Sequence, residues 1–138
     1  MRRVELFIAD IFAALFKIER YIEPFDSAEG FRHSGLHWDA VMRQLEIVGE
    51  LLNRLLKNEA FRHQAPSYFR SVVNFRNVIV HAYFGIDEDE VWDIVTQKLH
   101  LLRQDLSDLA KTYDMREAIE QICTEEDEAI CMHLKEIL

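Results

Sequence analysis

The chain has 138 residues and a formal net charge of −9, with 49% hydrophobic residues, 4 glycines and 2 prolines. This length fits one domain, and this apolar share excludes a disordered chain. The scarcity of glycine and proline favours a few long helices over many short strands. The acidic balance argues against a protein that coats nucleic acid generally, because phosphate neutralisation drives that kind of binding.

Two long helices are predicted in the first half of the chain. Apolar residues in 2–22 recur at alternating steps of four and three, typical of a helix that packs a narrow seam; they are Val4, Ile8, Ile11, Leu15, Ile18 and Ile22. Pro24, Gly30 and Gly35 break this pattern, with Ser27 as a cap for a short helical turn at 28–31. The same rhythm in 36–58 is carried by Val41, Leu45, Val48, Leu52 and Leu55.

A third helix is predicted after a linker at 64–66, with Ser67 as its N-cap and Gly85 at its end. Asp87 and Glu90 then have the spacing of a capping box and begin a fourth helix that runs to residue 112. Its inner face is formed by Val91, Val95, Leu99 or Leu102, and Leu106. The sequence shows no internal repeat and no convincing strand.

The last 25 residues, 114–138, contain 8 acidic and 2 basic side chains, and a helix is predicted to restart near Thr124 and Asp127. Cys123 and Cys131 match no metal or redox spacing. If one helix carried both, they would lie about 80° apart, so we expect packing residues and reduced thiols in a cytoplasmic protein. These patterns predict an all-α, antiparallel four-helix bundle at 1–112 with an acidic helical extension at 113–138.

The third helix lies in the one basic part of the chain. Residues 60–86 contain no Asp or Glu, while Arg62, Arg70 and Arg76 give this window a charge of +3. The remainder of the chain therefore sums to −12, since the total is −9. Such an island in an acidic protein indicates a site for an anion. Arg62 and Arg70 could steer RNA phosphates, although solvation of a loop explains them equally well.

Helix geometry separates the polar side chains of this segment into two groups. With Arg76 at zero, Tyr83 lies at about −20°, whereas Asn77 and His81 lie near 100° and 140°. The sector between them is apolar and is occupied by Val73, Val80 and Phe84. Apolar side chains between polar ones favour contact with another protein surface. We expect that surface to be the same helix of a second copy, related by a two-fold axis.

The chemistry of such a cleft suits RNA cleavage by the substrate's own 2′-hydroxyl. His81 can exchange protons near neutral pH, and Arg76 can bind a phosphate and stabilise the charge that develops on it. Asn77 would orient the imidazole or bind phosphate. Because the nucleophile belongs to the RNA, this reaction needs neither a metal nor another cofactor.

The residues Arg76-Asn77-x3-His81-x-Tyr83 resemble the Arg-x4-His-x-Tyr motif of HEPN-domain toxins, specifically the HepT group. The resemblance covers about residues 1–109. It also includes the opening of the first helix, the second-helix run from Asp39 to Glu50, and the stretch from Tyr83 to Asp87 followed by Val91 and Trp92.

This resemblance implies a HEPN-like bundle that dimerises through its motif helices and cleaves RNA without a metal. It implies the toxin of a toxin–antitoxin pair, with an MNT-type nucleotidyltransferase as the antitoxin, possible larger hetero-oligomers of the two, and transfer of AMP from ATP to Tyr83. An AMP group beside Arg76 would occupy the phosphate site. The tail from Asp114 onward exceeds the usual family length; it could contact the partner or mask the basic island.

Three other interpretations remain open from the sequence. Arg76 could form a purely structural ion pair with Glu46 or Glu50 of the second helix. The chain could be a non-catalytic HEPN module that binds a nucleotidyltransferase and is modified by it, which the charge of −9 favours. His33 and His37 have the i,i+4 spacing of a metal pair, but Gly35 between them and the lack of a third ligand argue against a metal site.

Overall fold

The computed structural model describes residues 3–81 and 85–138, and every regular element in these ranges is helical. The predicted all-α class is confirmed. In chain order, the helices are α1 (Arg3–Ile22), α2 (Ala28–His33), α3 (Gly35–Leu55), α4 (Glu59–Gln64), α5 (Phe69–His81), α6 (Glu88–Asp93), the π-helical segment η1 (Ile94–Lys98), α7 (Leu99–Ala110), α8 (Arg116–Glu125) and α9 (Glu128–Ile137).

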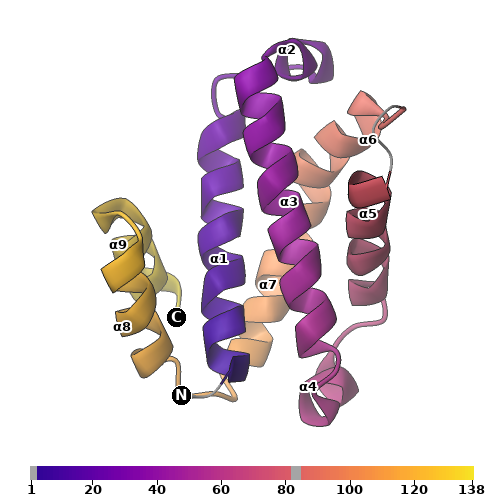
Figure 1. Cartoon of the computed structure of the whole chain (residues 1–138). Coiled ribbons are helices and arrows are strands. Elements are labelled where there is room, and N and C mark those ends of the chain that lie inside the picture. The colour runs from indigo at the N-terminus through magenta and orange to yellow at the C-terminus, as the bar shows by residue number, and fades with distance from the viewer. Residues whose placement is uncertain (1–2, 82–84) are drawn as a thin grey trace.

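Helix α1 lies in the middle of the molecule, with α3 and α7 on one side and the α8–α9 pair on the other (Figure 1). The predicted seam of α1 is the centre of the core, because Ile8, Ile11, Leu15 and Ile18 are each at most 1% exposed. The predicted seam of α3 is confirmed as well, since all five of its apolar residues are buried. Among the described residues, no helix combines the length and apolar character needed to cross a bilayer.

Helix α5 lies at the outer edge of the bundle, beside α3 and away from the α8–α9 pair (Figure 1). It begins at Phe69, two residues beyond the predicted cap Ser67, after backbone turns that join Phe69 to Pro66 and Arg70 to Ser67. The short helix α4 precedes it and was not predicted. Its N-cap is Asn58, whose side chain accepts from the Phe61 backbone N–H at 3.0 Å, and the fully buried Phe61 ring anchors it.

The predicted fourth helix is interrupted, because α6 and α7 are separated by the π-helical turns of η1. Asp87 is the N-cap, as predicted, and its side chain accepts from the Asp89 backbone N–H at 2.9 Å. In an ideal α-helix, residues four apart are rotated by about 40° from one another, so side chains spaced in this way move gradually off the buried face. The wider turns of η1 take up this drift, so that Val91, Val95 and Leu99 all remain buried.

Helices α8 and α9 form a hairpin that packs on α1. Their buried side chains are Ala118, Ile119, Ile122, Ile130 and Leu134, and Met115 just before α8 is buried as well. The expectation of packing cysteines with reduced thiols is wrong in this structure: Cys123 and Cys131 form a disulfide, with their Cα atoms 4.9 Å apart. The reason is that the chain turns back between α8 and α9, whereas the prediction placed both cysteines on one helix.

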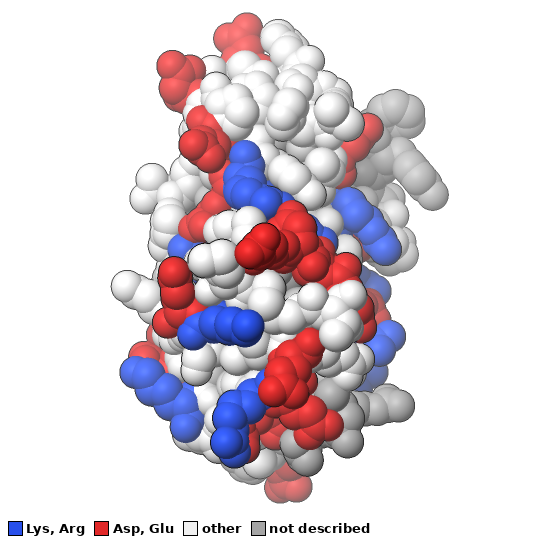
Figure 2. Space-filling view, turned by 90° about the vertical axis from the view of Figure 1, so that its left-hand side faces the viewer, with Lys and Arg blue, Asp and Glu red and all other residues white. Residues whose placement is uncertain are grey.

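The turn of this hairpin is fastened to α1 by ion pairs. Lys17 Nζ lies 2.7 Å from Glu126 Oε1, and Arg20 Nη2 lies 3.3 Å from Asp127 Oδ2. The His133 ring stacks on Phe16 with 4.3 Å between the centroids. Figure 2, which shows this side of the molecule, has acidic and basic side chains interleaved over the surface. The acidic tail is therefore a packed, partly neutralised part of the fold and lies on the side of α1 away from α5.

Asp10 of α1 lies close to this hairpin, and burial raises its pKa from 3.8 to about 6, with Glu125 and Glu126 adding to the effect. The folded protein therefore binds this proton more tightly than the unfolded chain does. The resulting penalty is fully present above pH 6 and is relieved as the pH falls from about 6 towards 3.8.

We expect Asp10→Asn to raise the free energy of unfolding near pH 7 by about 1 kcal/mol, a value discounted for the solvent screening of a half-buried group. The gain over the wild type should shrink as the pH falls through 6. Urea unfolding of both proteins at pH 7 and at pH 5 measures it. Asp26→Asn, at an exposed site, is the control; a gain that is independent of pH would contradict the assignment.

Candidate functional site

The site begins with the close approach of α5 to α3. A Cβ atom built on Gly49 of α3 would overlap the Cβ and Cγ atoms of Arg76 on α5. Gly49 is buried, so the two backbones meet at this point with no room for a side chain. Glycine at this position places the base of the Arg76 side chain directly on α3.

Arg76 is held by two hydrogen bonds at this contact. Its Nη2 donates to Glu50 Oε2 in an ion pair, and its Nη1 donates to Asn77 Oδ1 at 2.8 Å. Glu50 is one of the two carboxylates that the sequence offered as partners; the other, Glu46, lies 3.4 Å from Arg43 instead. A guanidinium carries five N–H donors, so these contacts leave others for a ligand. Those others are the second N–H groups of Nη1 and Nη2, because Nε is buried and lacks a hydrogen-bond partner among the described residues.

Asn77 and His81 lie on an exposed polar stripe of α5. Together with Arg70 and Asn74 they follow the spacing i, i+4, i+7 and i+11, and all four are exposed. Asn77 Oδ1 accepts from Arg76 Nη1, so this amide lies beside the guanidinium. His81 is the last residue of α5 and is open to solvent. The stripe contains no carboxylate, so an approaching polyanion meets only amide, imidazole and guanidinium groups along it.

In one chain, Arg76 and His81 do not form a single site. Five residues of helix separate them by about 7.5 Å along the axis and about 140° around it. In the predicted apolar sector between them, Val80 is 37% exposed, but Val73 is buried in the core, contrary to the expectation that it faces a second copy. Phe84 lies outside the described residues. Val78, on the far side of His81, is 49% exposed. A phosphodiester that touches both a guanidinium and an imidazole therefore needs groups from a second surface.

Arg62 and Arg70, the candidate RNA contacts, lie on different helices. Arg62 is on α4, and its Nη1 donates to the Leu56 carbonyl near the end of α3 at 3.4 Å. One of its hydrogen-bond donors is therefore already used within the chain. Arg70 is exposed on α5, in line with Asn77 and His81. The structure thus brings Arg70 onto the polar stripe and leaves Arg62 on another element. Tyr83, the candidate modification site, lies outside the described residues.

An apolar groove of about 450 Å³ separates α5 from η1 and α7. Val72 and Phe75 line it from α5 and Tyr68 from the turn just before this helix, with Ile94, Leu99 and Leu102 opposite. The Tyr68 hydroxyl donates to Asp105 Oδ2 at 2.6 Å and joins the two sides. Burial, and then Asp105 itself, raise the pKa of Tyr68. Helix α5 is therefore fastened to α3 along its inner face and leaves an apolar side uncovered.

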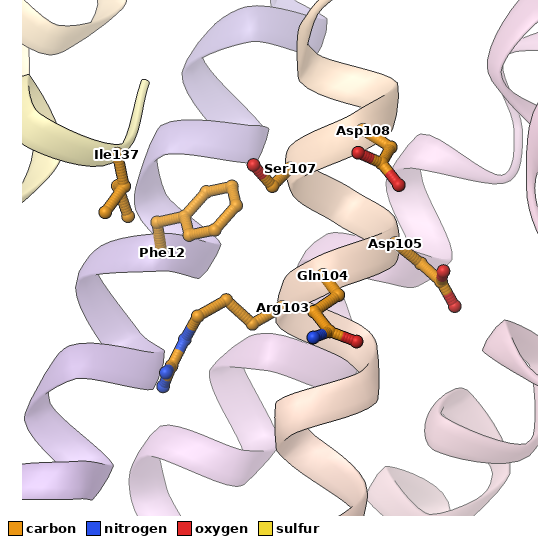
Figure 3. Close-up of a pocket in the computed structure, with 7 residues that line it drawn as sticks. All are labelled: Phe12, Arg103, Gln104, Asp105, Ser107, Asp108 and Ile137. Atoms are coloured by element: carbon orange, nitrogen blue, oxygen red, sulfur yellow. The ribbon is translucent and has the colours of Figure 1, made fainter.

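A second hollow, between α1 and α7, is lined by charged residues whose side chains do not point toward one another (Figure 3). Arg103 extends toward α1, where it forms an ion pair with Glu19, while Asp105 and Asp108 point away from it. Asp105 is taken by Tyr68, and Asp108 lies 3.2 Å from Lys111. Because each charge already has its own partner, this hollow is a weaker candidate than the α5 site.

The described residues hold no group of three or more His, Cys, Asp or Glu side chains that could bind a metal ion. His37, one of the two histidines with metal-pair spacing, is instead hydrogen-bonded through Nδ1 to Ser34 Oγ at 2.7 Å.

The all-α bundle formed by the described residues has the architecture of a HEPN-like domain. Residues 11–113 match the family described as "Ribonuclease HepT-like", so the chain belongs to this family. The α8–α9 hairpin lies beyond the matched region.

Two relatives illustrate the similarity. The Methanocaldococcus jannaschii protein named "Putative RNase MJ1380" is 30% identical over 106 residues, which cover 76% of this chain and 94% of that protein. The Thermococcus cleftensis protein named "Probable ribonuclease HepT" is 32% identical over 72 residues, covering 52% of this chain and 64% of that protein. No solved structure matches this chain significantly.

Gly49 is the site residue that the sequence analysis missed. It was noted only as part of the second-helix run that resembles the family, where it stands next to Glu50. A glycine in the middle of an amphipathic helix costs about 1 kcal/mol relative to alanine, so its presence among the packing residues of α3 was the available signal of a close backbone approach.

Proposed function

We propose that this protein is a metal-independent endoribonuclease whose active site forms between two copies of α5. The observation that carries the proposal is the arrangement of Arg76. Its guanidinium is fixed by Glu50 and Asn77, keeps free donors, and stands beside a stripe that ends in the exposed His81. Membership of a ribonuclease family supports the same chemistry.

In the proposed reaction, a neutral His81 imidazole takes the proton of the RNA 2′-hydroxyl, and the 2′-oxygen attacks the adjacent phosphorus. The P–O5′ bond breaks, and the leaving 5′-oxygen takes a proton from the protonated His81 of a second copy. Arg76 donates hydrogen bonds to the non-bridging oxygens, whose negative charge grows in the transition state. The products are a 2′,3′-cyclic phosphate and a 5′-hydroxyl, and later hydrolysis of the ring gives a 3′-phosphate.

The homodimer is proposed for two reasons that the single chain supplies. Arg76 and His81 lie too far around α5 to share one phosphate, and exposed valines occupy the surface between and beside them. A two-fold axis near Val80 would place the His81 of one copy beside the Arg76 of the other. It would also bury apolar surface that one copy leaves in water.

The biological setting belongs to the same proposal. The protein would be the toxin of a toxin–antitoxin pair, paired with an MNT-type nucleotidyltransferase and able to assemble with it into a larger complex. That partner would transfer AMP to Tyr83, and the added phosphate would compete with RNA at Arg76. The intact mass of protein produced together with its partner tests this step, because each adduct adds the mass of one AMP group.

The test of the nuclease is cleavage of single-stranded RNA in the presence of EDTA. We expect cleavage to persist and to yield 2′,3′-cyclic phosphate ends that convert slowly to 3′-phosphates. RNA with 2′-O-methyl groups is the control, because it has no free nucleophile and should stay intact. Cleavage that requires added Mg²⁺, or products with 5′-phosphates, would contradict the mechanism.

A non-catalytic HEPN module that binds a nucleotidyltransferase is the second candidate. Two observations favour it: the net charge of −9 repels RNA at a distance, and Arg76 already has a carboxylate partner in Glu50. Purified protein that binds the nucleotidyltransferase but leaves RNA intact under all conditions would support this module and refute the nuclease.

A further inference from the structure

We propose that Glu50 is a positioning residue for the reaction: it holds the Arg76 guanidinium in the orientation that receives the phosphate. This inference rests on the proposed ribonuclease function. It assigns a role to a residue on α3. This helix carries no residue of the Arg-x4-His motif and takes no part in the proposed proton transfers.

The geometry separates Glu50 from the other carboxylates near the site. Glu50 Oε2 accepts from Arg76 Nη2, while Glu50 Oε1 lies 3.4 Å from Arg54 Nε. Arg54 in turn stands over the Phe7 ring of α1, 5.8 Å from its centroid. The Glu50 carboxylate is therefore held from both sides, and it connects α5 through α3 to the central helix.

The base of the Arg76 side chain is fixed by its contact with Gly49, and its tip is fixed by Glu50 and Asn77. A long flexible side chain loses about 2 kcal/mol of rotamer freedom when it is immobilised. Here that ordering takes place on folding, before any substrate arrives. A guanidinium ordered in advance stabilises the transition state without further reorganisation, which is the condition for efficient electrostatic catalysis.

The same carboxylate has an opposing effect on binding. Its negative charge lies next to the guanidinium and weakens the attraction of Arg76 for an RNA phosphate. Removing the charge should therefore tighten substrate binding while loosening the orientation of Arg76. A residue that only supported the fold would not change KM and kcat in this combination.

The experiment compares Glu50→Gln with Glu46→Gln in RNA cleavage under single-turnover and steady-state conditions. Glutamine has nearly the shape of glutamate, which protects the fold. Glu46 is the matched control because it lies one turn away on α3, loses the same charge, and pairs with Arg43 rather than Arg76. For Glu50→Gln we expect kcat to fall about tenfold or more and KM to fall as well. For Glu46→Gln we expect kcat to be unchanged.

A second measurement does not depend on activity. Side-chain NMR of arginine, with the Arg76 signal identified by its loss in Arg76→Lys, reports whether the guanidinium rotates freely. We expect slow rotation in the wild type and in Glu46→Gln, and faster rotation in Glu50→Gln. An unchanged Arg76 signal in Glu50→Gln, or an unchanged kcat in an active enzyme, would overturn the positioning role. If the wild type cleaves no RNA, the nuclease proposal falls, and the NMR comparison alone decides whether Glu50 orders Arg76.

Discussion

Replacing His81 by alanine is expected to lower the rate of RNA cleavage by about two to four orders of magnitude, the usual contribution of a general acid–base group. In a symmetric dimer the substitution removes both the base that takes the 2′-hydroxyl proton and the acid that protonates the 5′-oxygen. Because His81 is exposed at the end of α5, the fold should be unaffected. Single-turnover cleavage of a labelled RNA measures the loss.

The control for this variant is His100→Ala, which removes an exposed imidazole from α7 and should leave cleavage unchanged. Arg76→Ala should also reduce the rate strongly, but through the loss of charge stabilisation rather than of proton transfer. An active His81→Ala protein with the wild-type product ends would refute the assigned role.

The second large effect is expected at Gly49. Replacing it by alanine normally stabilises a helix by about 1 kcal/mol. Here the added Cβ would overlap the first two side-chain carbons of Arg76, which cannot swing away without moving α5. We therefore expect Gly49→Ala to lower the free energy of unfolding by about 1–3 kcal/mol, and Gly49→Val to lower it further. Urea unfolding measures the change in stability.

Gly35→Ala is the matched control, because a Cβ atom at Gly35 would meet nothing within 4 Å. It should be neutral or slightly stabilising. A folded Gly49→Ala protein should also cleave RNA more slowly, since Arg76 is displaced together with α5. Gly49→Ala that is as stable as Gly35→Ala would contradict the close packing of α3 on α5.

The long helices could be predicted because their apolar spacing is unambiguous. In α1 and α3 a regular alternation of steps fixes one buried face, and the core uses that face. The fourth helix was harder, since the choice between Leu99 and Leu102 could not be made on an ideal α-helix. Both are buried because η1 changes the number of residues per turn, and nothing in the local sequence marks that change.

Which carboxylate pairs with Arg76 could not be predicted from the sequence. Glu46 and Glu50 are four residues apart and therefore lie on the same side of α3, so either could reach a neighbouring helix. The choice depends on how far α5 is shifted along α3, and this shift is set by the contact at Gly49. The prediction for the cysteines was wrong for a related reason, because it also depended on how two helices are placed. The disulfide needs the turn between α8 and α9, whereas the prediction assumed one continuous helix.

The central claim is that an RNA phosphate binds between the α5 helices of two copies of this chain. A crystal structure of His81→Ala bound to a 2′-O-methyl RNA oligonucleotide tests it most directly. We predict a dimer with Val80 at the interface and a phosphate within hydrogen-bonding distance of Arg76, close to residue 81 of the other copy. A structure in which the RNA lies elsewhere, or in which each Arg76 is enclosed with Glu50 and distant from the other copy, would contradict the claim.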